Sequence, residues 1–437
     1  MLPRTRTDRS VFRRETEQSA PADDLLIKPV GHQARPLRAV WLGLIVMLAQ
    51  LFVAVVLIAP EGPLWYRYST LIQHDSYWFA NIMDRGYDSI LPPISRKMME
   101  VSNVAFFPAY PMLASGLQKA FGLSTYTALL IVAQAAAWAF WSYVFLFADR
   151  WKLSPRLQFF GALAIAAHPT AFYLVTGYSE SLFLMALLGF IYWSGAEGKK
   201  AKFIAAAHGV VMSGTRIVGI PCAGYPVVRA VFTGGWARLW NVWGWLRNYA
   251  GAVTLTAVST LGAIGFFIYC HLRWGAWNLY MLTQEAGWNV HPDYLAIFKP
   301  ASYRWLVPAL ENATEASQMT MTLGALVFVA VAVFEFVAAR RHVSGWQARV
   351  GLYFCAFITY YIAVSGVASV AMESMLRYQF CAHVLIVLAF LHFLTHLPAP
   401  PKSVRAFGIG AAVLLCAASL ALQGWYVWTF TRGGWVA

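Results

Sequence analysis

Long apolar runs separated by short polar segments make up most of this chain. Each run approaches the length of about 20 residues that an α-helix needs to cross a lipid bilayer. The runs cover residues 39–59, 125–148, 157–175, 181–195, 249–271, 317–339, 349–371, 378–396 and 406–430. This pattern predicts an all-α, polytopic membrane bundle of about ten transmembrane helices.

A further apolar stretch, at about residues 203–231, is interrupted by Gly214, Arg216, Gly219 and Pro221. Both of its flanks are basic, so we expect both ends on the same side of the membrane. Two short or bent helices that meet at the interruption fit this pattern. Irregular backbone at membrane depth is tolerated where it is buried in protein or lines a cavity. The break therefore marks a candidate cavity.

Composition excludes a soluble globular protein. The 437 residues are 59% hydrophobic and 12% charged, whereas soluble proteins average about 25% charged residues. The net charge of +14 is divided among short loops, which argues against a nucleic-acid partner. The five cysteines lie in apolar runs without CxxC spacing, so we expect no disulfide framework and no metal site.

The positions of the basic residues predict the topology. Segments assigned to the inside carry about twice as many Lys and Arg residues as those assigned to the outside. This indicates a disordered basic cytoplasmic tail at 1–38, a membrane domain at 39–430 and a short outer tail at 431–437. The first outer loop, residues 60–124, is expected to hold interfacial helices, one of them following Phe106.

This topology places polar residues from distant parts of the chain on one side of the membrane. They are Asp75, His168, Glu180, Gln284 and Arg377, and the break at Arg216 points toward the same side. Belt residues that acted independently would have no reason to share a side. We therefore expect these groups to converge on one outward-facing cavity.

Asp75 follows the first apolar run and is surrounded by aromatic residues, among them Trp78. A carboxylate just outside a membrane span is suited to act as a base on a membrane-bound substrate. The alternative is that Asp75 caps an interfacial helix while the aromatic residues anchor it.

Two arginines are candidates for binding phosphate. Arg216 lies inside an apolar stretch, where an unpaired cation is costly. Arg377 lies near the start of an apolar helix, the end that disfavours a cation unless an anion joins it. The alternatives are a structural ion pair for Arg216 and snorkelling of Arg377 to the interface.

The remaining candidates would bind sugar or acceptor: Glu180, Gln284, His168, Tyr178 and Trp78. Glu180 would hold sugar hydroxyls or an active-site arginine, or else simply favour the first turn of its helix. Gln284 lies in an aromatic outer segment that is also typical of an interfacial helix. His168, taken alone, is more typical of a satisfied interfacial histidine.

Taken in order, these motifs resemble the PIG-V-like mannosyltransferases of the GT-C class. The resemblance rests on His74-Asp75-Ser76-Tyr77-Trp78-Phe79 with Arg85-Gly86-Tyr87, Phe106-Phe107-Pro108-Ala109-Tyr110-Pro111, Tyr178-Ser179-Glu180-Ser181-Leu182-Phe183, Thr215-Arg216 with Gly219, Gln284 with Trp288, and Ser374 to Tyr378. His74 and Ser76 depart from the family, which usually has Trp and Gly there. The compact loops are more similar to bacterial members than to the eukaryotic enzyme.

The resemblance implies a GT-C fold in a bacterial inner membrane, with the active site on the outer side. It implies transfer of a hexose, mannose in the family, from a polyprenyl-phosphate donor to a lipid-linked or membrane-proximal glycan. Asp75 would be the base of an inverting displacement, and Arg216 and Arg377 would bind the donor phosphate. The absence of a DxD motif also favours a lipid-phosphate donor, and neither a metal nor another cofactor is expected. A transporter or flippase of a lipid-linked saccharide and a non-catalytic assembly subunit are the alternatives.

Overall fold

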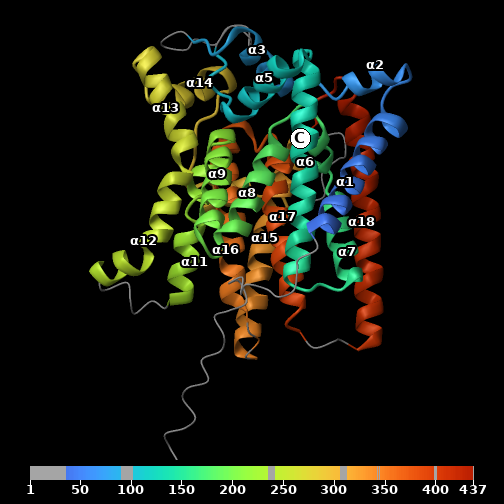
Figure 1. Ribbon diagram of the computed structural model, residues 1–437. Helices are drawn as coiled ribbons and strands as arrows, with labels where there is room; N and C mark the ends of the chain where they lie inside the picture. Colours follow the sequence, from blue (N-terminus) through green and yellow to red (C-terminus); the bar gives the residue numbers. More distant parts are fainter. Residues whose placement is uncertain are drawn as a thin grey trace, which may run out of the picture.

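The computed structural model describes residues 36–89, 102–234, 242–305, 313–341, 343, 345–397 and 401–436. Apart from one isolated β-bridge between Ser89 and Ser102, the secondary structure of these residues is helical. The helices form a bundle whose long members run roughly side by side (Figure 1). The all-α bundle predicted from the apolar runs is confirmed.

Six helices among the described residues are long and apolar enough to cross a membrane, and a bent pair would make a seventh. The six are α1 (Pro36–Phe52) with its π-helical extension to Ile58, α6 (Thr125–Arg150), α15 (Ala313–Arg340), α16 (Trp346–Val367), α17 (Met375–Leu394) and α18 (Lys402–Phe430). The bent pair consists of Tyr249–Ser259, within α12 (Val242–Ser259), and α13 (Leu261–Trp274), with an angle of 43° between its halves. Large apolar side chains on α15 and α18 are exposed, as lipid-facing helices require.

Helices that do not qualify as candidate spans account for the difference from the predicted number of about ten. These are α7 (Pro155–Ala166), α8 (Glu180–Ser194), α9 (Lys199–Thr215) and α11 (Tyr225–Gly234). The run at 157–175 is not one helix: α7 ends at Ala166, and a 3₁₀-helix follows at Ala171–Val175. Pro169 explains the interruption, because proline lacks an N–H group and disfavours helical backbone at the preceding residue.

The predicted break at 203–231 is present. Helix α9 ends at Thr215, Arg216 has extended backbone (φ −151°, ψ 145°), and the short helix α10 (Gly219–Cys222) leads into α11. Gly219 allows this close turn, because a Cβ atom there would lie 2.7 Å from the Cα of Ser213. Arg216 therefore lies in the extended segment between α9 and α10.

Short helices gather at one end of the bundle, which we call the α3 end (upper end in Figure 1). They are α2 (Leu64–Ser69), α3 (Asp75–Arg85), α5 (Ala109–Phe121) and α14 (Leu279–Trp288). Helices were predicted in this part of the first loop, although their depth in a membrane stays a prediction. Helix α5 buries Tyr110, Pro111 and Ala114 on one face and packs on α3 and α6.

The two ends of the chain differ. Most of the predicted basic tail lies outside the described residues, and its last three residues form the first turn of α1. The C-terminal segment folds back onto the bundle after α18. There the hydroxyl of Tyr173 donates a hydrogen bond of 2.8 Å to the carbonyl of Val436, and His74 Nε2 lies 3.1 Å from the carbonyl oxygen of Gly434.

Candidate functional site

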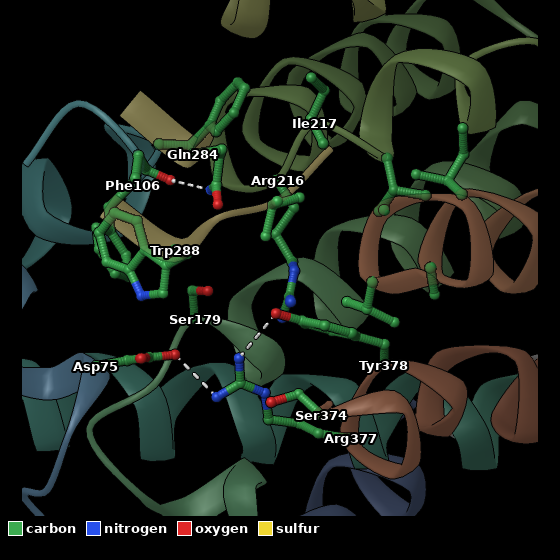
Figure 2. A pocket seen from close by; sticks show the side chains of 18 of the residues that line it. Asp75, Phe106, Ser179, Arg216, Ile217, Gln284, Trp288, Ser374, Arg377 and Tyr378 are labelled. Atoms are coloured by element: carbon green, nitrogen blue, oxygen red, sulfur yellow. Dashed lines mark hydrogen bonds and ion pairs between the residues drawn. The ribbon is translucent and has the colours of Figure 1, made fainter. Parts of the chain in front are cut away.

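A cavity of 1510 Å³ opens where α3, α14, the α9–α10 break, α16 and α17 meet. Polar side chains predicted as site residues line it: Asp75, Glu180, Arg216, Gln284 and Arg377. Figure 2 shows several of them pointing toward one another from separate elements. The predicted convergence is therefore present for these five.

Asp75 is the first residue of α3, and its carboxylate faces into the cavity rather than back onto the helix. Its Oδ2 accepts a hydrogen bond of 2.8 Å from Nη1 of Arg377. The N-cap position belongs to His74, whose side chain makes no capping hydrogen bond. The alternative that Asp75 serves as a helix cap is not supported, because its carboxylate is engaged with an arginine across the cavity.

Arg377 is the third residue of α17 and is 6% exposed. Its guanidinium lies over three tyrosine rings, 5.6 Å from Tyr173, 5.3 Å from Tyr178 and 5.0 Å from Tyr378. Aromatic faces attract a desolvated cation. This burial contradicts snorkelling, because the cation is held inside the protein.

Glu180 begins α8 and is buried beside both arginines. Its Oε1 lies 2.7 Å from Nη1 of Arg216 and 3.4 Å from Nε of Arg377. Its Oε2 is buried and has no hydrogen-bond partner among the described residues. Glu180 therefore contacts both arginines, and it also lies in the first turn of α8, where an anion is favoured.

The four side chains form a row of alternating charges: Asp75, Arg377, Glu180 and Arg216. Arg216 is the most exposed member, at 23% of its side chain, and its guanidinium lies 5.3 Å from the ring centre of Tyr378. Two carboxylates balance two guanidinium groups. Removal of one partner from a buried row of this kind leaves an uncompensated charge, which costs about 3–5 kcal/mol.

Aromatic residues cover the side of the cavity nearest α14. The ring of Trp78 stacks on Phe106 at 5.6 Å and lies 5.2 Å from Trp288. Gln284 Nε2 donates hydrogen bonds of 3.4 Å to the carbonyl of Ala105 and to the hydroxyl of Tyr280. Burial raises the pKa of Tyr280 to about 12, so this hydroxyl is neutral at physiological pH. A wall of aromatic rings and a neutral amide suits a sugar ring.

Two predicted sugar-binding residues lie behind the cavity instead of lining it. Tyr178 is buried beneath Arg377, and its hydroxyl accepts a hydrogen bond of 3.4 Å from the backbone N–H of Asp75. His168 packs against His383, with ring centres 4.7 Å apart, and its Nδ1 lies 3.1 Å from Thr170 Oγ1. Tyr178 therefore positions two site residues, whereas His168 belongs to the packing behind them.

One lining residue carries no strong signal in the sequence. Trp435 lies near the end of the chain, lines the cavity, and has its ring centre 5.0 Å from that of His74. A tryptophan after two glycines in a short tail has no local pattern that marks it as functional. Its placement depends on α18 returning the chain to the α3 end.

The described residues hold no group of three or more His, Cys, Asp or Glu side chains arranged to bind a metal ion. The strongest binding groups on the cavity wall are the two guanidinium groups, and guanidinium recognises phosphate and carboxylate by charge-assisted hydrogen bonds. The cavity wall thus offers two groups that can contact an anion, beside the carboxylates of Asp75, Glu180, Glu285 and Glu373, which also line it.

Several solved structures are similar to this chain. No family model and no curated protein matches the sequence. Among solved structures, the chain is similar to ArnT from Cupriavidus metallidurans bound to undecaprenyl phosphate, with 14% sequence identity and a TM-score of 0.46. That match covers 90% of this chain and 76% of the other.

Proposed function

We propose that this protein is a membrane glycosyltransferase that moves a hexose from a polyprenyl-phosphate donor to a glycan acceptor. The single observation that carries the proposal is that Asp75, Arg377 and Arg216 line one cavity. Asp75 is paired with Arg377, and Arg216 lies at the other end of the same charged row. A transferase of this kind needs a base for the acceptor hydroxyl and cations for the phosphate leaving group. The cavity wall offers both.

The donor phosphate would contact the two arginines from the cavity, because Glu180 occupies the position between them. Arg216 is partly exposed and Arg377 lies behind it, so a phosphate entering the cavity meets Arg216 first. The polyprenyl chain would lie along the apolar wall formed by Ile217 and Ile220 near the break and by Ile362 on α16. Apolar residues next to a cationic site fit a lipid phosphate better than a free nucleotide.

In the proposed reaction, Asp75 accepts the proton of the acceptor hydroxyl while that oxygen attacks the anomeric carbon. The bond from this carbon to the phosphate oxygen breaks, and the electron pair leaves with the polyprenyl phosphate. The leaving group thereby gains negative charge, which Arg216 and Arg377 stabilise. Attack opposite the leaving group inverts the anomeric configuration.

Gln284 and Trp78 would orient the transferred sugar, because both lie on the aromatic wall of the cavity. Mannose is proposed from the motif resemblance alone. From the same resemblance and the charge pattern we propose a bacterial inner membrane, with a cytoplasmic N-terminus and the α3 end outside. Each of these points can be tested separately.

A transfer assay tests the proposal directly. Purified protein in liposomes is supplied with polyprenyl-phosphate-mannose labelled in the sugar, together with candidate glycolipid acceptors. We expect label to move into the acceptor and polyprenyl phosphate to accumulate in equal amount. Polyprenyl-phosphate-glucose and polyprenyl-phosphate-arabinose in parallel reactions identify the sugar. Absence of transfer from all donors to a broad acceptor panel would refute the enzyme assignment.

A further inference from the structure

A second hollow lies beside the large cavity. It measures 570 Å³ and is formed by α2, the turn before α3 and the chain just after α18. We call it the Gln73 groove, defined by the residues that line it: Pro60, Tyr66, Ser69, Thr70, Ile72, Gln73, Tyr77, Thr431, Arg432 and Gly433. Most of these residues are polar or aromatic.

One thin wall separates the Gln73 groove from the large cavity. Gln73 lines the groove, whereas the next residue, His74, lines the cavity. The C-terminal segment repeats this division, because Gly433 lines the groove and Trp435 lines the cavity. Tyr77 lines both hollows. Tyr77 and the chain at Gln73 and His74 therefore form a wall that the two spaces share beside Asp75.

The backbone of His74 produces this division. Its φ is +45°, in the left-handed region that non-glycine residues seldom adopt. Such strain persists where the surrounding structure holds it, and it is concentrated at functional sites. The ring of His74 is held by Trp435 and by the carbonyl of Gly434, at 3.1 Å from Nε2. The strained residue directs Gln73 and Asp75 toward different spaces.

Three hydroxyl groups of the groove donate their protons to backbone carbonyls. The hydroxyls of Ser69, Thr431 and Tyr77 each donate to a backbone carbonyl, at 2.7, 2.9 and 3.3 Å respectively. Their protons are thus engaged. Thr431 is buried, whereas Ser69 and Tyr77 are exposed, so the lone pairs of these two hydroxyls are left to accept hydrogen bonds from a ligand. A ligand that complements them must supply donors, as the hydroxyls of a saccharide do.

Arg432 adds a positive charge to this surface. It is exposed, and its Nη1 donates to the carbonyls of Ile58 and Trp428 at 3.3 and 3.0 Å. These two hydrogen bonds hold the guanidinium group beside the groove through its Nη1 atom. The described acidic side chains do not line the groove. A negatively charged group on the ligand would therefore gain a charge-assisted hydrogen bond here.

We infer that the Gln73 groove binds the acceptor, a saccharide that carries a phosphate or carboxylate group. Its hydroxyls contact Gln73 and the groove hydroxyls, its anionic group contacts Arg432, and its reacting hydroxyl passes Tyr77 to reach Asp75. This inference rests on the proposed function, because it gives the acceptor a place of its own, apart from the donor. It also explains why the base lies at the junction of two hollows.

A binding experiment tests the groove without any transfer. Saturation-transfer NMR is recorded on protein in a detergent without a sugar headgroup, with methyl mannoside, mannose 6-phosphate or glucuronate. We expect signals from the two anionic saccharides to exceed those from methyl mannoside, and the stronger anion identifies the charged group. Arg432→Gln should abolish this preference, and Gln73→Ala should weaken the signals of all three saccharides. Equal signals in wild type and variants, or none in wild type, would overturn the inference.

Arg67→Gln is the matched control. Arg67 also donates to carbonyls at the end of α1, with a distance of 2.6 Å to that of Val56, but it does not line the groove. Loss of a helix-end contact is thus common to both arginine variants, whereas loss of groove charge is confined to Arg432→Gln. Arg67→Gln should keep the wild-type binding preference.

Kinetics separate failure of this inference from failure of the proposed function. If the wild-type protein transfers sugar, Arg432→Gln should raise the KM for an anionic acceptor about tenfold or more and leave the donor KM unchanged. An unchanged acceptor KM, or an equal rise in both KM values, would refute the groove as the acceptor site. A wild-type protein without transfer refutes the proposed function, while the NMR result still decides whether the groove binds saccharide.

Discussion

Arg377 donates a hydrogen bond of 2.8 Å to Asp75, and the same guanidinium lies 3.4 Å from Glu180. The proposed base is therefore paired with one of the cations proposed to receive the donor phosphate. A phosphate placed near Arg377 competes with Asp75 for that cation. In our proposal the donor thereby loosens the Asp75 ion pair and leaves the carboxylate better able to accept a proton once the donor is bound.

Asp75→Asn gives the sharpest test of the base. The variant keeps the size of the side chain and an oxygen that can accept from Arg377, but an amide does not take up the proton. We expect folding and donor binding to persist, and transfer to fall by about 10²–10⁴-fold. Single-turnover transfer and donor binding are measured on the same preparation.

Asp84→Asn is the control for Asp75→Asn. Asp84 lies on the same helix, α3, and accepts a hydrogen bond of 2.7 Å from Thr125, outside the cavity. Its variant should transfer at nearly the wild-type rate. Transfer by Asp75→Asn within a small factor of wild type would place the base elsewhere, and unchanged saccharide flux without transfer would favour a transporter.

The two arginines should differ in their response to substitution. Arg216→Ala and Arg377→Ala should each raise the donor KM and lower the rate of transfer, because each removes a charge-assisted contact to phosphate. Arg377→Ala should also destabilise the protein, because Arg377 is buried and contacts two carboxylates. Donor titrations and thermal unfolding measure the two effects separately.

Lysine substitutions and a surface control complete that test. Lysine has one ammonium group in place of the planar guanidinium fork, so rescue should be poor at a bidentate contact. Arg85→Ala, on the exposed end of α3, should leave the donor KM unchanged. Donor saturation like that of wild type in both alanine variants would exclude the arginines from the phosphate site.

Glu180→Gln should lower the stability of the protein and strengthen its binding of anions. The substitution leaves two guanidinium groups facing one carboxylate, so the free energy of unfolding should fall by about 3–5 kcal/mol. The excess positive charge should at the same time strengthen binding of inorganic phosphate or pyrophosphate. Added pyrophosphate should therefore raise the Tm of Glu180→Gln more than that of wild type. An equal shift in both would show that Glu180 does not balance the arginines.

Cysteine labelling tests the orientation. Single cysteines replacing Ser89 and Ser403 are labelled in intact cells with a reagent that does not cross the membrane. Ser89 lies near the α3 end and Ser403 at the start of α18, at the opposite end. We expect label at position 89 only. Background should be low, since four of the five native cysteines are buried and Cys416 is half-buried. Label only at position 403 would reverse the topology.

The helical bundle and the candidate residues could be predicted from the sequence, because both depend on local properties of the chain. Apolar runs of spanning length specify helices in a bilayer regardless of their neighbours. The break near Arg216 followed from glycine and proline at fixed positions, and Asp75 and Arg377 were identifiable because charge is rare in such surroundings.

The pairing of the charges and the set of residues that face the cavity depend on how the helices pack. Asp75 and Arg377 are separated by 302 positions, so no local pattern could pair them. Packing between α7 and α17 buries His168 beside His383, and the ring of Tyr178 is covered by Arg377. Trp435 reaches the cavity because α18 returns the chain to the α3 end. These relationships arise from helix packing, which brings together residues from separate elements and excludes others of the same chemical type.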